Sequence, residues 1–262
     1  MTTILLAAAI VAGIGLLAGV GLAIAGVVLH VPVDERVERL TAALPGTNCG
    51  ACGYPGCEAY AKAIAGEDAA CNLCIPGGTN TAQTLAEIMG IAVEEVPERR
   101  AIVLCGGTEE ACGLSYEYRG EQSCDAASLL YSGQRLCNYG CLGFGDCIKA
   151  CPYDAISLRG GIAAIDPSNC VGCALCVPAC AKGIIVMTES RGRAVNLCCS
   201  ETSGHAVRKQ CKSGCISCHI CERACPADAV IYERHLARID PAKCIGCGAC
   251  AAKCPTKCIV MY

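Results

Sequence analysis

The chain has 262 residues and a formal net charge of −3 when every cysteine is counted as neutral. It contains 28 cysteines and 30 glycines, but one phenylalanine and no tryptophan. The large side chains that usually fill a core are therefore nearly absent, and disulfides or metal are expected to take their place. No basic stripe and no RNA-binding aromatic motif is present, which excludes a nucleic-acid-binding protein.

Residues 1–31 are predicted to be a transmembrane anchor. Residues 4–29 carry no charged side chain, and a helix of that length would extend about 39 Å, enough to cross a ~30 Å hydrocarbon layer with some tilt. A cleaved signal peptide is the alternative, but the preceding MTT has no Lys or Arg and the apolar run is too long. Arg36, Arg39 and Lys62 follow the anchor, so the positive-inside tendency places the remainder in the cytoplasm, on a single-pass chain in the cell membrane.

Residues 32–100 are predicted to be a small helical module holding one [4Fe-4S] cluster. Its expected ligands have the spacing C-x2-C-x4-C-x16-C and are Cys49, Cys52, Cys57 and Cys74. The first three lie on a glycine-rich loop, which lets backbone N–H groups approach sulfur. Cys71 competes for the fourth position, but the Pro-Gly-Gly turn at 76–78 favours Cys74. We expect helices over about 55–65, 33–44 and 81–89.

Residues 101–136 form a predicted lead-in to a duplicated region. Residues 137–180 and 211–254 align without a gap, and duplication at a fixed spacing indicates two copies of one module. Each copy contains a predicted hairpin, with alternating apolar residues around a turn at Gly160-Gly161 or Arg234-His235. The predicted modules are residues 137–197 and 198–262, and the predicted fold class is α+β.

The second copy carries the bacterial ferredoxin spacing C-x2-C-x2-C-x3-C, followed by proline. In that arrangement three close thiolates bind one [4Fe-4S] cubane and the fourth binds its neighbour. One predicted ligand set is Cys215, Cys218, Cys221 and Cys254. The other is Cys225, Cys244, Cys247 and Cys250.

In the first copy, Phe144 occupies the position of Cys218, which leaves one cluster short of a ligand. Cys137, four residues before Cys141, is predicted to supply it. The two sets are Cys137, Cys141, Cys147 and Cys180, and Cys151, Cys170, Cys173 and Cys176. Zinc knuckles need only paired C-x2-C units, and a disulfide framework would need an exported chain. The spacing therefore favours five iron–sulfur clusters.

Further cysteines remain outside these five sets: Cys71, Cys105, Cys112, Cys124, Cys198, Cys199, Cys211 and Cys258. We interpret them as buried free thiols, which pack as small hydrophobic residues. The alternative is a sixth cluster drawn from Cys105, Cys124, Cys198 or Cys199, and Cys211.

The anchor, the first cysteine loop ending in Pro-Gly-Gly, and the segment CNYGCLGFGDCIKACP together resemble the B subunit of the Rnf-type ferredoxin:NAD⁺ oxidoreductase complex. The resemblance covers nearly the whole chain, and two ferredoxin modules are found in the longer versions from anaerobes. It implies a membrane translocase that passes electrons from reduced soluble ferredoxin toward NAD⁺, coupled to ion transport, with membrane and flavin-carrying subunits as partners. The family's cluster ligands match the first cysteine loop and then the ferredoxin-type cysteines.

No G-x-G-x-x-G follows a predicted strand, as a dinucleotide site would need, and we find no nucleophile–base pair. We therefore expect no catalytic residues on this chain, which has the parts to relay electrons while a partner performs the substrate chemistry. An electron-relay subunit of an ion-pumping complex is the predicted function. A membrane-tethered polyferredoxin or redox-sensor partner without ion pumping is the alternative.

Overall fold

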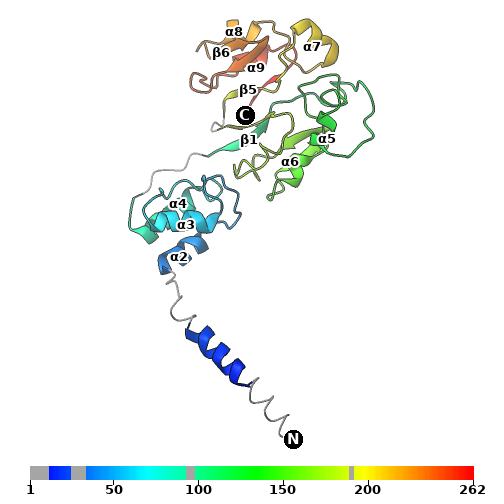
Figure 1. The fold of residues 1–262 in the computed structure, drawn as a ribbon. Helices are drawn as coiled ribbons and strands as arrows, with labels where there is room; N and C mark the ends of the chain where they lie inside the picture. The colour runs from blue at the N-terminus through cyan, green and yellow to red at the C-terminus, as the bar shows by residue number, and fades with distance from the viewer. Residues whose placement is uncertain (1–11, 25–33, 93–97, 189–191) are drawn as a thin grey trace.

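The computed structural model describes residues 12–24, 34–92, 98–188 and 192–262. Beyond the N-terminal segment, Figure 1 shows a helical module followed by two ferredoxin-like modules that lie against each other. Each of the three modules has its own cluster of buried side chains.

Only part of the predicted membrane anchor falls within the described residues. Residues 12–24 are helical and exposed, whereas residues 4–11 and 25–29 lie outside the described ranges. In the part of the chain that the structure describes, no helix has both the length and the apolar character needed to cross a bilayer.

The helical module consists of α2 (Glu35–Ala43), α3 (Cys57–Ala65) and α4 (Gly78–Met89). Asp34 caps α2, because its Oδ1 accepts the N–H of Arg36 at 2.9 Å. Leu40 from α2, Tyr60 from α3 and Leu85 from α4 are fully buried in one cluster. The three helices predicted from the sequence are therefore confirmed, with shifts of a few residues at their ends.

The first ferredoxin module contains β1 (Arg100–Val103), α5 (Cys124–Ser128), α6 (Asp146–Lys149), β2 (Ile156–Arg159), β3 (Ile162–Ile165) and β4 (Ile185–Thr188). Strands β2 and β3 form the predicted hairpin, with Ile156 opposite Ile165. Strand β1, from the predicted lead-in, pairs antiparallel with β4 at the end of the module. The lead-in is thus built into the fold of this module.

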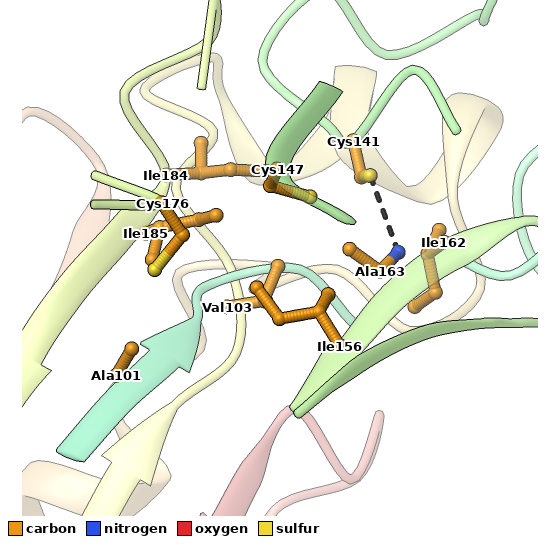
Figure 2. Close-up of a cluster of buried hydrophobic side chains, with 10 residues drawn as sticks. All are labelled: Ala101, Val103, Cys141, Cys147, Ile156, Ile162, Ala163, Cys176, Ile184 and Ile185. Atoms are coloured by element: carbon orange, nitrogen blue, oxygen red, sulfur yellow. Dashed lines mark hydrogen bonds between the residues drawn. The ribbon is translucent and has the colours of Figure 1, made fainter. Parts of the chain in front are cut away.

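The core of the first module combines aliphatic side chains with cysteines (Figure 2). Val103 from β1, Ile156 from β2 and Ile162 from β3 are all buried there. The Cys141 sulfur accepts the backbone N–H of Ala163 at 3.4 Å, drawn as the dashed line in Figure 2. Sulfur therefore occupies the interior that large aromatic side chains fill in most domains.

The second ferredoxin module contains β5 (Ala194–Asn196), α7 (Gly204–Gln210), α8 (Ile220–Ala224), β6 (Val230–Glu233), β7 (Leu236–Ile239), α9 (Ala249–Lys253) and β8 (Ile259–Met261). Strand β6 pairs with β7 and β5 pairs with β8. The β6–β7 turn has φ of 46° at Arg234 and 68° at His235, and the β2–β3 turn has 56° at Gly160 and 73° at Gly161. Two left-handed residues at a tight turn are typical of hairpins, so both predicted hairpins are confirmed.

Backbone hydrogen bonds join the two ferredoxin modules through the segment after β1. The N–H of Gly106 donates to the carbonyl of Leu197 at 2.9 Å, and the N–H of Lys212 donates to the carbonyl of Ala111 at 2.8 Å. The modules therefore share a built junction.

Candidate iron–sulfur sites

The first predicted ligand set gathers beside the N-terminus of α3. The N–H of Cys57 donates to Asn48 Oδ1 at 2.8 Å, which ties the glycine-rich loop to the helix. Burial, and then the thiols of Cys57, Cys52 and Cys49, raise the pKa of Cys74, because like charges close together disfavour the thiolate. Burial alone raises the pKa of Cys71. The structure thus groups Cys74, rather than Cys71, with the other three.

Tyr60 organises the segment that brings Cys74 back to this site. Its hydroxyl donates to the carbonyl of Ala70 at 2.7 Å and accepts the N–H of Leu73 at 3.2 Å. Burial raises the pKa of Tyr60, so the hydroxyl stays a hydrogen-bond donor. The sequence contains no spacing signal that would have identified this residue.

In the first ferredoxin module, one predicted set lines a single cavity as expected: Cys151, Cys170, Cys173 and Cys176. Tyr153 also lines it, and its hydroxyl hydrogen-bonds the hydroxyl of Thr47 in the helical module at 2.6 Å. Burial and the thiols of Cys173, Cys49 and Cys74 all raise the pKa of Tyr153. Cysteines of two predicted cluster sites, from different modules, therefore lie near this tyrosine.

The other predicted set of this module comes together only in part. Cys141, Cys147 and Cys180 line one cavity, but the fourth cysteine there is Cys124, and Cys137 lines a different cavity. Burial and the thiols of Cys141, Cys124 and Cys180 raise the pKa of Cys147 to about 12, as expected for four thiols close together.

Asp146 holds Cys124 in this position. Its Oδ2 accepts the backbone N–H of Cys124 at 2.7 Å and that of Asp125 at 3.2 Å. Cys124 begins α5 and Asp146 begins α6, so the carboxylate ties the N-terminus of one helix to that of the other. Sequence spacing could not reveal this contact, because Cys124 lies outside the aligned repeat.

In the second module, one cavity is lined by the predicted set Cys215, Cys218, Cys221 and Cys254, together with Cys258. The sulfurs of Cys254 and Cys258 are 3.6 Å apart. For the remaining predicted set, burial and then the thiols of Cys244 and Cys225 raise the pKa of Cys250, which places these three near one another.

The donor sets fit [4Fe-4S] clusters. Backbone N–H groups donate to ligand sulfurs, from Ala101 to Cys170 at 3.5 Å and from Ala229 to Cys225 at 3.3 Å, and such bonds surround protein-bound clusters. Because burial raises the pKa of the Cys74, Cys147 and Cys250 thiols, binding iron to them would release protons. Within the described ranges, no three Cys, His, Asp or Glu side chains converge closely enough to hold a single metal ion.

Comparison with known proteins bears on the same residues. The protein-family model described as "Putative Fe-S cluster" matches residues 44–76. Two family models described as "4Fe-4S dicluster domain" match residues 136–184 and 214–259. The B subunit of the Na(+)-translocating ferredoxin:NAD(+) oxidoreductase complex of Acetobacterium woodii is 41% identical over 92% of this chain and 72% of its own length.

Two further relatives cover more of their own length. The B subunit of the ion-translocating oxidoreductase complex of Methanosarcina acetivorans is 36% identical over 90% of this chain and 89% of its own length. The B subunit of the proton-translocating ferredoxin:NAD(+) oxidoreductase complex of Clostridium ljungdahlii is 38% identical over 92% of this chain and 85% of its own length. The chain belongs to the family of B subunits of ion-translocating oxidoreductase complexes, as its resemblance to the Rnf-type protein predicted.

Proposed function

We propose that this chain is the electron-relay subunit of a membrane complex that oxidises reduced ferredoxin and drives NAD⁺ reduction on partner subunits, coupled to ion translocation. The observation that carries the proposal is the grouping of cysteines into four-thiol sites in three consecutive modules. Each [4Fe-4S] cluster would take up and pass on one electron, and the chain's own residues set where the clusters stand.

Three of the proposed ligand sets line cavities, and the other two are proposed from their spacing in the sequence and from thiols that lie near one another. Four sets are those predicted from spacing. In the fifth, Cys124 joins Cys141, Cys147 and Cys180 in place of Cys137. This assignment leaves Cys137 available for another role.

The path of electrons is proposed to run through the contact at Tyr153. The helical module stands next to the predicted membrane segment in the sequence, and Cys49 and Cys74 of its cluster site lie near Tyr153, as does Cys173. The hydrogen bond between Tyr153 and Thr47 fixes the two modules against each other there. Ferredoxin would then deliver electrons to the ferredoxin modules, and the helical module would pass them to membrane and flavin-carrying subunits.

The membrane attachment is part of the proposal. The uncharged run at residues 4–29 supports a single-pass anchor in the cell membrane, and the basic residues that follow it support cluster domains on the cytoplasmic side. We place the anchor at 1–31, the helical module at 32–100, the lead-in at 101–136, and the ferredoxin modules at 137–197 and 198–262.

The test is anaerobic purification of the full chain from its native membrane in mild detergent. We expect co-isolation with membrane and flavin-carrying subunits, and ferredoxin-dependent NAD⁺ reduction in membranes that is lost when the chain is deleted. Isolation as a lone polypeptide, from membranes without that activity, would overturn the proposal in favour of a tethered polyferredoxin. Deletion of residues 1–30 should release the chain from the membrane with its iron retained.

A further inference from the structure

A fourth cysteine-rich cavity lies at the junction of the two ferredoxin modules. Its volume is about 20 Å³, the same as that of each of the two four-cysteine cavities of the first module. Six cysteines line it: Cys105, Cys112, Cys137, Cys198, Cys199 and Cys211. None of them belongs to the five sets proposed above.

Three of these sulfurs surround two glycines in the cavity wall. A Cβ placed on Gly107 would lie 3.3 Å from the Cys211 sulfur and 3.7 Å from the Cys105 sulfur, so these sulfurs are separated by at most the sum of those distances. A Cβ on Gly140 would lie 3.5 Å from the Cys105 sulfur and 3.8 Å from the Cys137 sulfur. With metal–thiolate bonds close to ~2.3 Å, as in zinc sites, thiolates on different corners of one cubane are roughly 6 Å apart, which these limits allow.

Cys199 completes the group on the first-module side. Its sulfur lies 3.3 Å from the carbonyl oxygen of Tyr139, which stands between Cys137 and Cys141 in the same loop. It packs against the core of the first module, whereas its neighbour Cys198 packs against the core of the second.

Cys211 is preferred over Cys112 as the fourth ligand. Cys211 occupies the position of Cys137 in the other copy of the repeat, so the two modules present equivalent cysteines to the junction. Cys112 belongs to the lead-in, where it forms an isolated antiparallel bridge with Cys211.

A buried cation provides a second, independent indication. Arg135 lines the cavity and is only 4% exposed. Its guanidinium donates to the carbonyls of Gly107 at 2.9 Å and Gly161 at 2.6 Å, but its Nε has no hydrogen-bond partner among the described residues, nor does it form an ion pair with them. The thiol of Cys112 also faces this guanidinium, and its pKa is lowered by a hydrogen bond with Cys211 and by Arg135. A buried cation is costly unless its charge is balanced, and four thiolates around an oxidised cubane would supply a net charge of about −2.

We propose that this junction cavity holds a sixth [4Fe-4S] cluster, bound by Cys105, Cys137, Cys199 and Cys211, with the Arg135 guanidinium balancing part of its charge. The cluster would stand between the two ferredoxin modules and connect their clusters in one relay. The inference rests on the proposed assignment of the other five sites, because it takes Cys137 from one of them. It also replaces the interpretation of these cysteines as free thiols.

The test is the number of clusters in the full chain, purified without oxygen and measured by iron, acid-labile sulfide and native mass spectrometry. We expect about 24 iron atoms and six clusters per chain. A count of about 20 iron atoms and five clusters would overturn the sixth site while leaving the proposed function intact. A count far below 20 would instead contradict the five-cluster assignment.

Single substitutions locate the site. Cys105→Ala and Cys199→Ala should each remove about four iron atoms, while the other five clusters remain and show that the protein has folded. Cys198→Ala, next in the chain to Cys199, is the matched control and should keep all six clusters. The ligand assignment is refuted if Cys198→Ala loses a cluster and Cys199→Ala retains it.

The fourth ligand is tested in the same way. Cys211→Ala should lose the junction cluster and Cys112→Ala should keep it. The reverse result would exclude Cys211 as a ligand.

Discussion

Replacing Asp146 by alanine should weaken one cluster site specifically, because Asp146 holds the proposed ligand Cys124 in place. The change removes two charge-assisted hydrogen bonds to the start of α5, at 2.7 Å and 3.2 Å. A hydrogen bond to a charged group contributes about 1.5–3 kcal/mol. The second N–H, that of Asp125, is exposed and can bind water instead. We therefore expect the free energy that holds α5 against α6 to fall by about 2–3 kcal/mol.

The expected consequence is more frequent detachment of α5 from α6. A loss of about 2–3 kcal/mol raises the detached population by roughly 30- to 150-fold. Ser123 Oγ still accepts the N–H of Ala126 at 3.2 Å, so α5 itself keeps its cap. The cluster should then be left on three cysteines much of the time and lose one iron.

The assay is the rate of iron release to a chelator under anaerobic conditions, together with the EPR signal of a three-iron cluster in the oxidised protein. Asp34→Ala is the matched control, because it removes an equivalent helix cap from α2 in another module. We expect faster release and a three-iron signal in Asp146→Ala only. If Asp146→Ala releases iron at the wild-type rate, and Cys124→Ala keeps the cluster of Cys141, Cys147 and Cys180 intact, the assignment of Cys124 is wrong.

Three further predictions concern other sites. Cys254→Ala should damage the cluster of the 215–221 loop rather than that of the 244–250 loop, and an EPR spectrum showing the reverse would exclude the crossed ligation. Gly172 and Gly183 have positive φ values of 75° and 61°, so alanine at either position should cost about 1–2 kcal/mol in backbone strain. Of these two positions, only Gly172 would also bring the new Cβ into collision with a backbone carbonyl. Cluster loss in denaturant should therefore begin at a clearly lower concentration for Gly172→Ala, and equal midpoints would contradict this. Tyr60→Phe should lower the stability of the helical module by about 1–3 kcal/mol, because the carbonyl of Ala70 and the N–H of Leu73 lose their partner. We expect faster iron loss from the first site. An unchanged rate would show that water replaces the hydroxyl.

Features decided by short stretches of sequence could be predicted well. The β2–β3 and β6–β7 hairpins follow from alternating apolar residues around a turn, and the structure has both. The set of Cys151 and its three partners follows from ferredoxin spacing, and the structure places it around one cavity. In each case the residues that decide the geometry lie close in the chain or repeat at a fixed distance.

Features decided by tertiary packing could not be predicted in this way. Cys124 reaches its cavity because Asp146, far along the chain, accepts the hydrogen bonds of its helix. Proximity in sequence favoured Cys137 instead, but the loop that carries Cys137 faces the module junction. The pairings of β1 with β4 and of β5 with β8 were not anticipated either, because each joins segments separated by most of a module.

The same two strand pairings explain why the junction is rich in cysteine. After β1, the N–H of Leu104 donates to the carbonyl of Ile184; after β5, the N–H of Leu197 donates to the carbonyl of Cys258. The next residue is a cysteine in both modules, Cys105 and Cys198, so these two cysteines are equivalent in the fold although a gapless alignment does not match them.

Cys137 and Cys211 form a second equivalent pair, and all four of these cysteines line the junction cavity. Duplication therefore brought two copies of a cysteine-bearing edge face to face. Neither module alone presents four thiols to one cluster, but the two modules together do. In the proposed set, Cys199 is the ligand instead of its neighbour Cys198. A single-module relative would lack this junction, so the second module adds a connection between clusters as well as the clusters that it contains.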